Sequence, residues 1–147
     1  MERTQSKSYH EKGQWEQLSK LKADFFREID HVESLANLDP QKINEFADNI
    51  AKIIHADIAT SQLRKVYGEM KRLQKSAKFE AKKLSVFAPR LAYASARTHQ
   101  LQHVYELFEK CRPKISNEKD MEKFIYILEA LVAYHKYYYE KYGRRES

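Results

Sequence analysis

The chain has 147 residues, of which 42% are hydrophobic and 33% are charged. These values are typical of one globular domain and exclude a disordered chain, which lacks the apolar residues needed for a core. The formal net charge of +6 favours a polyanionic or acidic partner, and the single cysteine, Cys111, excludes an intrachain disulfide and fits a reducing cytoplasm.

The N-terminal segment MERTQSKSYHEKGQW contains no apolar stretch of signal-peptide length. No apolar run elsewhere approaches the roughly 20 residues that a membrane-spanning helix needs. We therefore expect a cytoplasmic protein with no membrane contact.

Turn-forming residues are scarce, with only three glycines and three prolines, and no segment alternates apolar with polar residues. This pattern predicts an all-α fold. We expect a compact single-domain bundle of about five helices over residues 14–142, between flexible ends at residues 1–13 and 143–147.

The first predicted helix runs from about Trp15 to Ala36. Asp39 and Pro40 form an N-cap and a first-turn proline, which predicts a second helix ending near Ala59. The apolar residues that recur at helical spacing in these two segments are Trp15, Leu18, Leu21, Phe25, Ile29, Val32, Ile43, Phe46, Ala47, Ile50 and Ile54.

Thr60 or Ser61 is predicted to cap a third helix. A fourth helical stretch runs from about Phe79 to Cys111, and we expect Pro89 to kink or restart it. Its apolar seam consists of Leu84, Leu91, Leu101 and Phe108.

Ser116 or Asn117 opens the final predicted helix. One side of this helix is predicted to face the core and carries Phe124, Leu128, Leu131, His135, Tyr138 and Tyr142.

Positive charge is concentrated between Thr60 and Arg97, where ten Lys or Arg residues stand against two acids and give a net charge of +8. Arg64, Lys71 and Lys75 fall on one helical flank, and a second series recurs every seven residues at Lys83, Arg90 and Arg97. Such a stripe predicts a polyanion-binding surface. The alternative is that these charges bridge to acids on a neighbouring helix.

Catalytic motifs are absent: there is no glycine-rich phosphate loop, GxSxG, HExxH or CxxC. His99, His103 and Glu106 have a spacing that suits zinc, but solvated histidines explain them better. Cys111 beside Arg112 has no neighbouring base in the sequence and is interpreted as a structural thiol.

Two further clusters are better explained by solvation or packing than by function. The carboxylates Asp24, Glu28 and Asp30 are interpreted as a solvated helix face rather than an acid–base pair. The tyrosines near the C-terminus could stack on unpaired bases, but most of them are expected to pack in the core. They are Tyr134, Tyr137, Tyr138, Tyr139 and Tyr142.

Three strings resemble, in order and spacing, the small subunit of type III-A CRISPR effector complexes: TSQLRKVYGEM from Thr60, APRLAYASAR from Ala88 and FIYILEALVAYHKYY from Phe124. The resemblance covers roughly residues 39–142 and implies a helical, non-catalytic protein present in several copies in a ribonucleoprotein. It also implies RNA-facing positions at Arg64, Lys65, Arg90, Arg97 and Lys136. The first predicted helix is longer than the family leads us to expect.

The resulting hypothesis is an RNA-binding structural subunit for antiviral defence that contacts the backbone of guide and target RNA without sequence specificity. Its expected partners are these RNAs and other subunits of the complex, with self-association as a further option and with no cofactor, metal or catalytic residue. The predicted RNA-binding residues are Arg64, Lys65, Lys71, Lys83, Arg90, Arg97 and Lys136.

Two alternative hypotheses remain open. One is a helical adaptor whose basic face binds an acidic protein. The other is a metal-dependent hydrolase that uses His99 and His103.

Overall fold

A computed structural model describes residues 2–75, 80–98 and 101–142, with backbone alone for 2–12. The described part contains six α-helices and no strand, which confirms the all-α prediction with one helix more than expected. The helices are α1 (Glu2–His31), α2 (Pro40–Ile54), α3 (Thr60–Lys75), α4 (Lys83–Arg97), α5 (Gln102–Cys111) and α6 (Glu118–Tyr142). Two short 3-10 helices, η1 (Leu35–Asn37) and η3 (Arg112–Lys114), lie in the connections.

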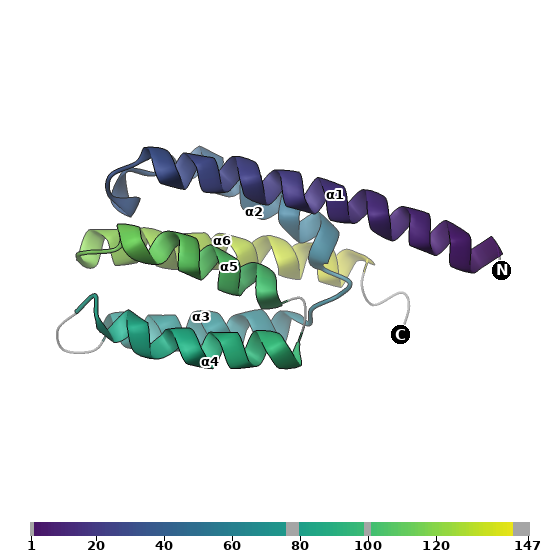
Figure 1. Cartoon of the computed structure of the whole chain (residues 1–147). Coiled ribbons are helices and arrows are strands. Elements are labelled where there is room, and N and C mark those ends of the chain that lie inside the picture. Colours follow the sequence, from purple (N-terminus) through teal and green to yellow (C-terminus); the bar gives the residue numbers. More distant parts are fainter. Residues whose placement is uncertain (1, 76–79, 99–100, 143–147) are drawn as a thin grey trace.

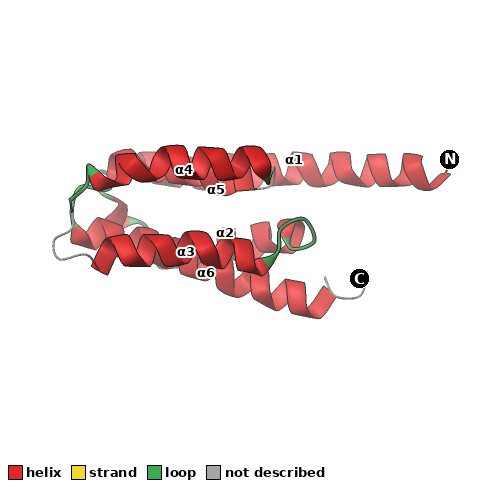
Figure 2. Cartoon of the chain, turned by 90° about the horizontal axis from the view of Figure 1, so that it is seen from below, coloured by secondary structure: helices red, strands yellow, loops and turns green. Residues whose placement is uncertain are grey.

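The six helices form two layers of three (Figures 1 and 2). In one layer α5 lies between α1 and α4, and in the other α6 lies between α2 and α3. The N-terminal part of α1 extends beyond the other helices (Figure 1). The bundle therefore has two long edges, one formed by α1 and α2 and the other by α3 and α4.

The core fills the space between the layers. All four residues of the seam predicted for 79–111 are buried, and so are Phe124, Leu128 and Leu131 of α6. Phe108 is completely buried, with its ring centroid 5.7 Å from that of Phe87 and 5.9 Å from that of Phe124. These three aromatic rings join α4, α5 and α6.

Two helix starts follow the predicted capping signals, whereas at α3 the Thr60 hydroxyl lies against His135 instead. The Asp39 carboxylate accepts a hydrogen bond of 3.0 Å from the Gln41 backbone N–H, and Pro40 occupies the first turn of α2. The Asn117 side chain accepts a hydrogen bond of 2.9 Å from the Asp120 N–H at the start of α6. The predicted caps of α2 and α6 are thus confirmed.

Several boundaries differ from the prediction. Helix α1 begins at Glu2 rather than Trp15 and ends at His31 rather than Ala36, and α2 ends at Ile54 rather than near Ala59. The flexible ends proposed at 1–13 and 143–147 stay predictions. The backbone of 2–13 continues α1, but a helical backbone does not by itself test flexibility, and 143–147 lie outside the described residues.

The early end of α1 has a tertiary cause. The buried Asp120 carboxylate accepts hydrogen bonds from the Ser34 hydroxyl, the Ala36 N–H at 2.9 Å and the Ser116 N–H at 3.0 Å. Burial alone raises the pKa of Asp120, but these donors outweigh it and hold the pKa below its ordinary value. The hydrogen bonds from Ser34 and Ala36 to Asp120 of α6 therefore replace a continuation of α1.

We predict a kink or a restart of the helix at Pro89. The break within 79–111 instead lies after Arg97. Pro89 is inside α4, and both Pro89 and Ser85, whose carbonyl loses its helical donor, are exposed, so water can satisfy that carbonyl. Thr98 instead takes an extended conformation, with φ of −119° and ψ of 97°, and its hydroxyl accepts a hydrogen bond of 3.2 Å from the Gln62 amide.

Two predicted core residues are in fact at the surface. Trp15 is 58% exposed and Tyr142 is 44% exposed. Trp15 lies in the first half of α1, and Tyr142 is the last residue of α6. Neither position has enough neighbouring helix to cover a large side chain.

His135 links α3 to α6. This residue is completely buried, and its Nδ1 lies 3.0 Å from the hydroxyl of the buried Thr60. Burial, with a smaller contribution from nearby His55, lowers the pKa of His135 to about 4. The imidazole is therefore neutral at pH 7.

None of the helices in the described part of the chain combines the length and the apolar character that a membrane crossing requires.

Candidate nucleic-acid interface

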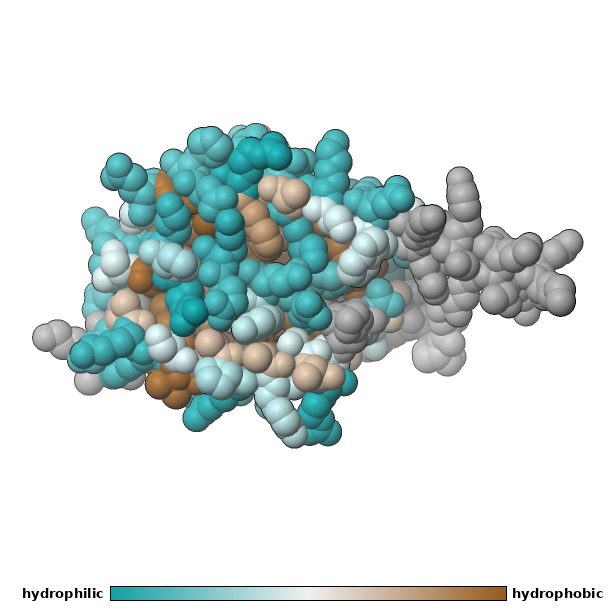
Figure 3. All heavy atoms as spheres, viewed as in Figure 1, coloured by the Kyte–Doolittle hydropathy of each residue, from teal (hydrophilic) through white to brown (hydrophobic). Residues whose placement is uncertain are grey.

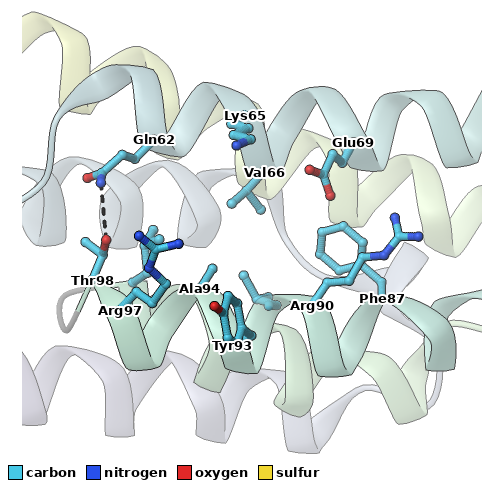
Figure 4. A pocket seen from close by; sticks show the side chains of 12 residues that line it. Gln62, Lys65, Val66, Glu69, Phe87, Arg90, Tyr93, Ala94, Arg97 and Thr98 are labelled. Carbon is cyan, nitrogen blue, oxygen red and sulfur yellow. Dashed lines mark hydrogen bonds between the residues drawn. The ribbon is translucent and has the colours of Figure 1, made fainter.

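The edge formed by α3 and α4 is open. A cavity of about 450 Å³ lies between the two helices, and the Gln62–Thr98 hydrogen bond crosses one end of it (Figure 4). Its lining residues are Gln62, Lys65, Val66, Glu69, Phe87, Arg90, Leu91, Tyr93, Ala94, Arg97, Thr98 and Leu101.

A second cavity of about 480 Å³ continues the first. The two share Glu69, Phe87 and Arg90, and the second adds Arg72, Leu73, Lys83 and Val86. Together they form one trough along both helices, which we call the α3/α4 groove.

The α3/α4 groove is lined by five cations and one acid. The cations are Lys65, Arg72, Lys83, Arg90 and Arg97, and the acid is Glu69. Of the ion pairs found among the described residues, none involves Lys65, Arg72, Arg90 or Arg97. For these four side chains the described structure therefore gives no support to bridges with a neighbouring helix.

Helical spacing explains why the cations of α4 line one groove. Lys83, Arg90 and Arg97 are seven residues apart, which is close to two turns, so they emerge from the same side of the helix. Figure 4 shows Arg90 and Arg97 on the α4 wall, opposite Gln62, Lys65 and Glu69 of α3. The predicted common direction of Arg90 and Arg97 is confirmed.

Three predicted residues lie outside the groove lining, and we call Arg64, Lys71 and Lys136 the off-groove cations. Arg64 is exposed on α3, as predicted, while Leu63, Val66 and Met70 are buried. The Lys71 ammonium lies 6.0 Å from the ring centroid of Tyr67. Lys136 lines a shallow depression on α6 with Ala133, Tyr137, Glu140 and Lys141. The predicted set is therefore divided between at least two surfaces.

Two groove residues were missing from the predicted site. Arg72 follows Lys65 by seven residues, the same spacing that identified the cations of α4. Tyr93 follows Arg90 by three residues and precedes Arg97 by four, so all three share one side of α4. Both could have been identified from these spacings.

Lys22 contacts two of the three residues considered as metal ligands. Its ammonium lies 2.7 Å from the Glu106 carboxylate and 3.0 Å from His103 Nδ1. His99, the third candidate, lies outside the described residues, and no cluster of three potential ligands occurs among the residues that are described.

The other residues considered for catalysis, Cys111 and the acidic cluster of α1, are mostly buried or paired with a cation. Cys111 is completely buried, and burial raises the pKa of its thiol. The neighbouring Arg112 pairs with Glu109 at 2.8 Å. In the acidic cluster, the Asp30 carboxylate lies 2.8 Å from the Lys110 ammonium, and Asp24 lies 3.9 Å from Arg27.

The tyrosine cluster of α6 is partly packed and partly exposed. The Tyr138 hydroxyl donates to the Asp48 carboxylate, and this bond raises the pKa of Tyr138 to about 12. Tyr137 is 54% exposed, and the Lys141 ammonium lies 5.4 Å from its ring centroid and 5.3 Å from that of Tyr142. The exposed members are therefore covered in part by a lysine of their own helix.

The α3/α4 groove falls within the part of the chain that resembles known proteins. Residues 37–141 match the family model described as Csm2 Type III-A. This range contains α2 to α5 and all of α6 except Tyr142, and it leaves α1 outside. No curated protein and no solved structure was found to match the chain.

Proposed function

The chain belongs to the Csm2 family of type III-A CRISPR effector complexes. We propose that it binds RNA in such a complex and does so through the α3/α4 groove. The proposal has three parts: the groove holds the backbone of guide or target RNA, it does so without sequence specificity, and the subunit performs no chemistry of its own.

The observation that carries the proposal is a group of three exposed cations in the groove. Lys65, Arg90 and Arg97 are exposed, line one cavity and take part in no ion pair of the described residues. Phosphate binding needs accessible Lys and Arg side chains at intervals along a track, and arginine can hold a phosphate through two parallel hydrogen bonds.

The shape of the groove favours backbone contact. It is an open trough rather than a closed pocket, and its polar side chains are mostly long cations. Contacts to phosphate position an RNA without reading its sequence, which a subunit that serves many guides requires.

The test is RNA affinity measured by fluorescence anisotropy over a range of salt concentrations. In the groove variant, Lys65→Glu with Arg90→Glu and Arg97→Glu, we expect affinity for unrelated RNA sequences to fall by at least about tenfold. The slope of log K against log salt should flatten by about 2, since each phosphate contact with a single strand contributes about 0.7.

The matched control reverses three exposed lysines outside residues 60–97. Lys20→Glu with Lys42→Glu and Lys119→Glu changes the total charge by the same amount. If this control weakens binding as much as the groove variant does, a diffuse positive field explains the affinity and the groove is not the site.

A third variant tests the off-groove cations. Arg64→Glu with Lys71→Glu and Lys136→Glu also changes the charge equally, and we expect a loss between those of the groove variant and the control. A loss larger than that of the groove variant would move the RNA site to the surface that carries Arg64.

The same samples test the absence of chemistry. RNA recovered after incubation with Mg²⁺, Mn²⁺ or Zn²⁺ should have its original length. Cleavage that a His103→Ala variant abolishes would support a metal-dependent hydrolase instead.

A further inference from the structure

Tyr93 is a large ring that the fold leaves uncovered. It is 66% exposed, more than any other large hydrophobic side chain found exposed in the described part. An isolated exposed tyrosine is ordinary, but this one lines the α3/α4 groove between two arginines. Its position therefore calls for an explanation in terms of a ligand.

The two arginines flank the ring along the helix. Arg90 lies three residues before Tyr93 and Arg97 four residues after it, and the Arg97 guanidinium carbon is 6.0 Å from the ring centroid. Over seven residues an α-helix rises about 10 Å, so the arginines could hold successive parts of one backbone with the ring between them. Figure 4 shows all three side chains on the same wall of the groove.

Small neighbours keep the ring accessible. Ala92, Ala94 and Ala96 surround Tyr93 in the sequence, and Ala94 lines the groove beside it. Figure 3 shows the face formed by α1, α5 and α4. Near the lower edge of this face, over α4, many side chains are pale, which marks intermediate hydropathy. The residues directly before and after Tyr93 are therefore too small to cover its ring, and the side chain that lies over it is Arg97.

The chemistry that fits a cation-flanked exposed ring is an unpaired nucleobase. Aromatic side chains stack on bases of any sequence, whereas the bases of a duplex are paired and already stacked on each other. The exposed Tyr137 of α6 is a poorer candidate, because it is less exposed than Tyr93 and Lys141 donates to its hydroxyl at 3.3 Å. The Lys141 ammonium also lies 5.4 Å from the Tyr137 ring centroid, closer than Arg97 lies to the ring of Tyr93.

We propose that Tyr93 is a base-stacking residue: the α3/α4 groove takes single-stranded RNA, one unpaired base lies on the Tyr93 ring, and Arg90 and Arg97 hold the flanking phosphates. This inference rests on the proposed function and adds to it the kind of RNA that the groove accepts. Because stacking tolerates every base, the site stays independent of sequence.

The experiment compares two RNA probes of equal length and phosphate count, one intact single strand and one with abasic ribose at every position. We expect the intact protein to bind the intact strand more tightly than the abasic one. Tyr93→Ala should lose about five- to tenfold in affinity for the intact strand, the lower end of what loss of one stacked base costs, and nothing for the abasic strand.

Two variants serve as controls. Tyr93→Phe keeps the ring and should bind both probes as the unaltered protein does, and Tyr137→Ala removes a similarly exposed tyrosine and should have no effect. The slope of log K against log salt should be the same for Tyr93→Ala and the unaltered protein, because the variant changes no charge.

The outcomes separate this inference from the proposed function. Equal affinity of the unaltered protein for both probes, or unchanged binding by Tyr93→Ala, overturns the stacking role and leaves phosphate binding in place. If Tyr93→Ala keeps its RNA affinity but loses another subunit of the complex, the ring contacts protein and the inference is also wrong. Failure of the unaltered protein to bind either probe at low salt contradicts the proposed function itself.

Discussion

The two long edges of the bundle are built differently. At the α1/α2 edge, Phe25 and Phe46 stack with ring centroids 4.1 Å apart and planes 8° from parallel. Ion pairs also join α1 to α5, from Lys22 to Glu106 at 2.7 Å and from Lys110 to Asp30 at 2.8 Å. At the α3/α4 edge there is instead a groove lined by cations, of which Lys65, Arg72, Arg90 and Arg97 take part in no ion pair of the described residues.

This difference separates charges that hold the fold from charges that do not. Lys22 and Lys110 each have an acid within hydrogen-bond distance, whereas Arg90 and Arg97 take part in no ion pair of the described residues. Clustered like charges repel each other and lower the stability of the compact state. A surface that keeps them is better explained by a polyanionic partner than by stability.

The largest effect that we predict tests the α1/α2 edge. Phe25→Ala removes a ring that is 3% exposed and stacked on Phe46, so the free energy of unfolding should fall by about 3 to 5 kcal/mol. Urea denaturation followed by circular dichroism measures this change. Tyr93→Ala at the open edge is the matched variant and should change stability by less than about 0.5 kcal/mol.

A loss of less than about 1 kcal/mol in Phe25→Ala would contradict the comparison. It would mean that α1, which lies outside the family match, is attached to the bundle only weakly.

The second prediction concerns the contact that attaches α3 to α6. Since the pKa of the buried His135 is lowered to about 4, the unfolded chain binds a proton that the folded chain does not between about pH 6.5 and pH 4. Stability should therefore be complete above about pH 6.5 and fall as the pH decreases, by at most about 1.4 kcal/mol per pH unit.

The measurement is the thermal midpoint of unfolding between pH 7.5 and pH 4.5. In His135→Gln the decrease should be smaller than in the unaltered protein. A pH profile that is the same in both proteins would show that His135 is not the titrating group.

Much of the fold could be predicted because it depends on local pattern. Apolar residues at helical spacing identified the buried seam of 79–111, and the capping residues Asp39 and Asn117 marked two helix starts. The end of α1 could not be predicted in this way. It depends on Asp120, which is more than 80 residues away in the sequence.

The candidate site was predictable only in part, for a related reason. Seven-residue spacing places Arg90 and Arg97 on one side of α4, whatever surrounds that helix. It cannot say which side of α3 faces α4, and so it could not separate Lys65, which lines the groove, from Arg64, which does not. The side that faces a groove is set by tertiary packing.

The smallest effect that we predict is on stability, and it tests the open edge directly. Arg90→Gln with Arg97→Gln removes two exposed cations that take part in no ion pair of the described residues, so the free energy of unfolding should not fall by more than about 0.5 kcal/mol. Relief of repulsion within a segment of net charge +8 could even raise it, most clearly at low salt, where charges are least screened.

Lys110→Gln with Lys22→Gln at the other side of the bundle removes the same charge but breaks two ion pairs, one of them to a lysine that is only 13% exposed. That variant should lose more than the first, and the difference should be measurable by urea denaturation at 20 mM and 500 mM salt. If the two double variants lose equal stability at both salt concentrations, the cations of the groove support the fold as much as the ion-paired lysines Lys22 and Lys110 do, and their exposure would no longer point to a ligand.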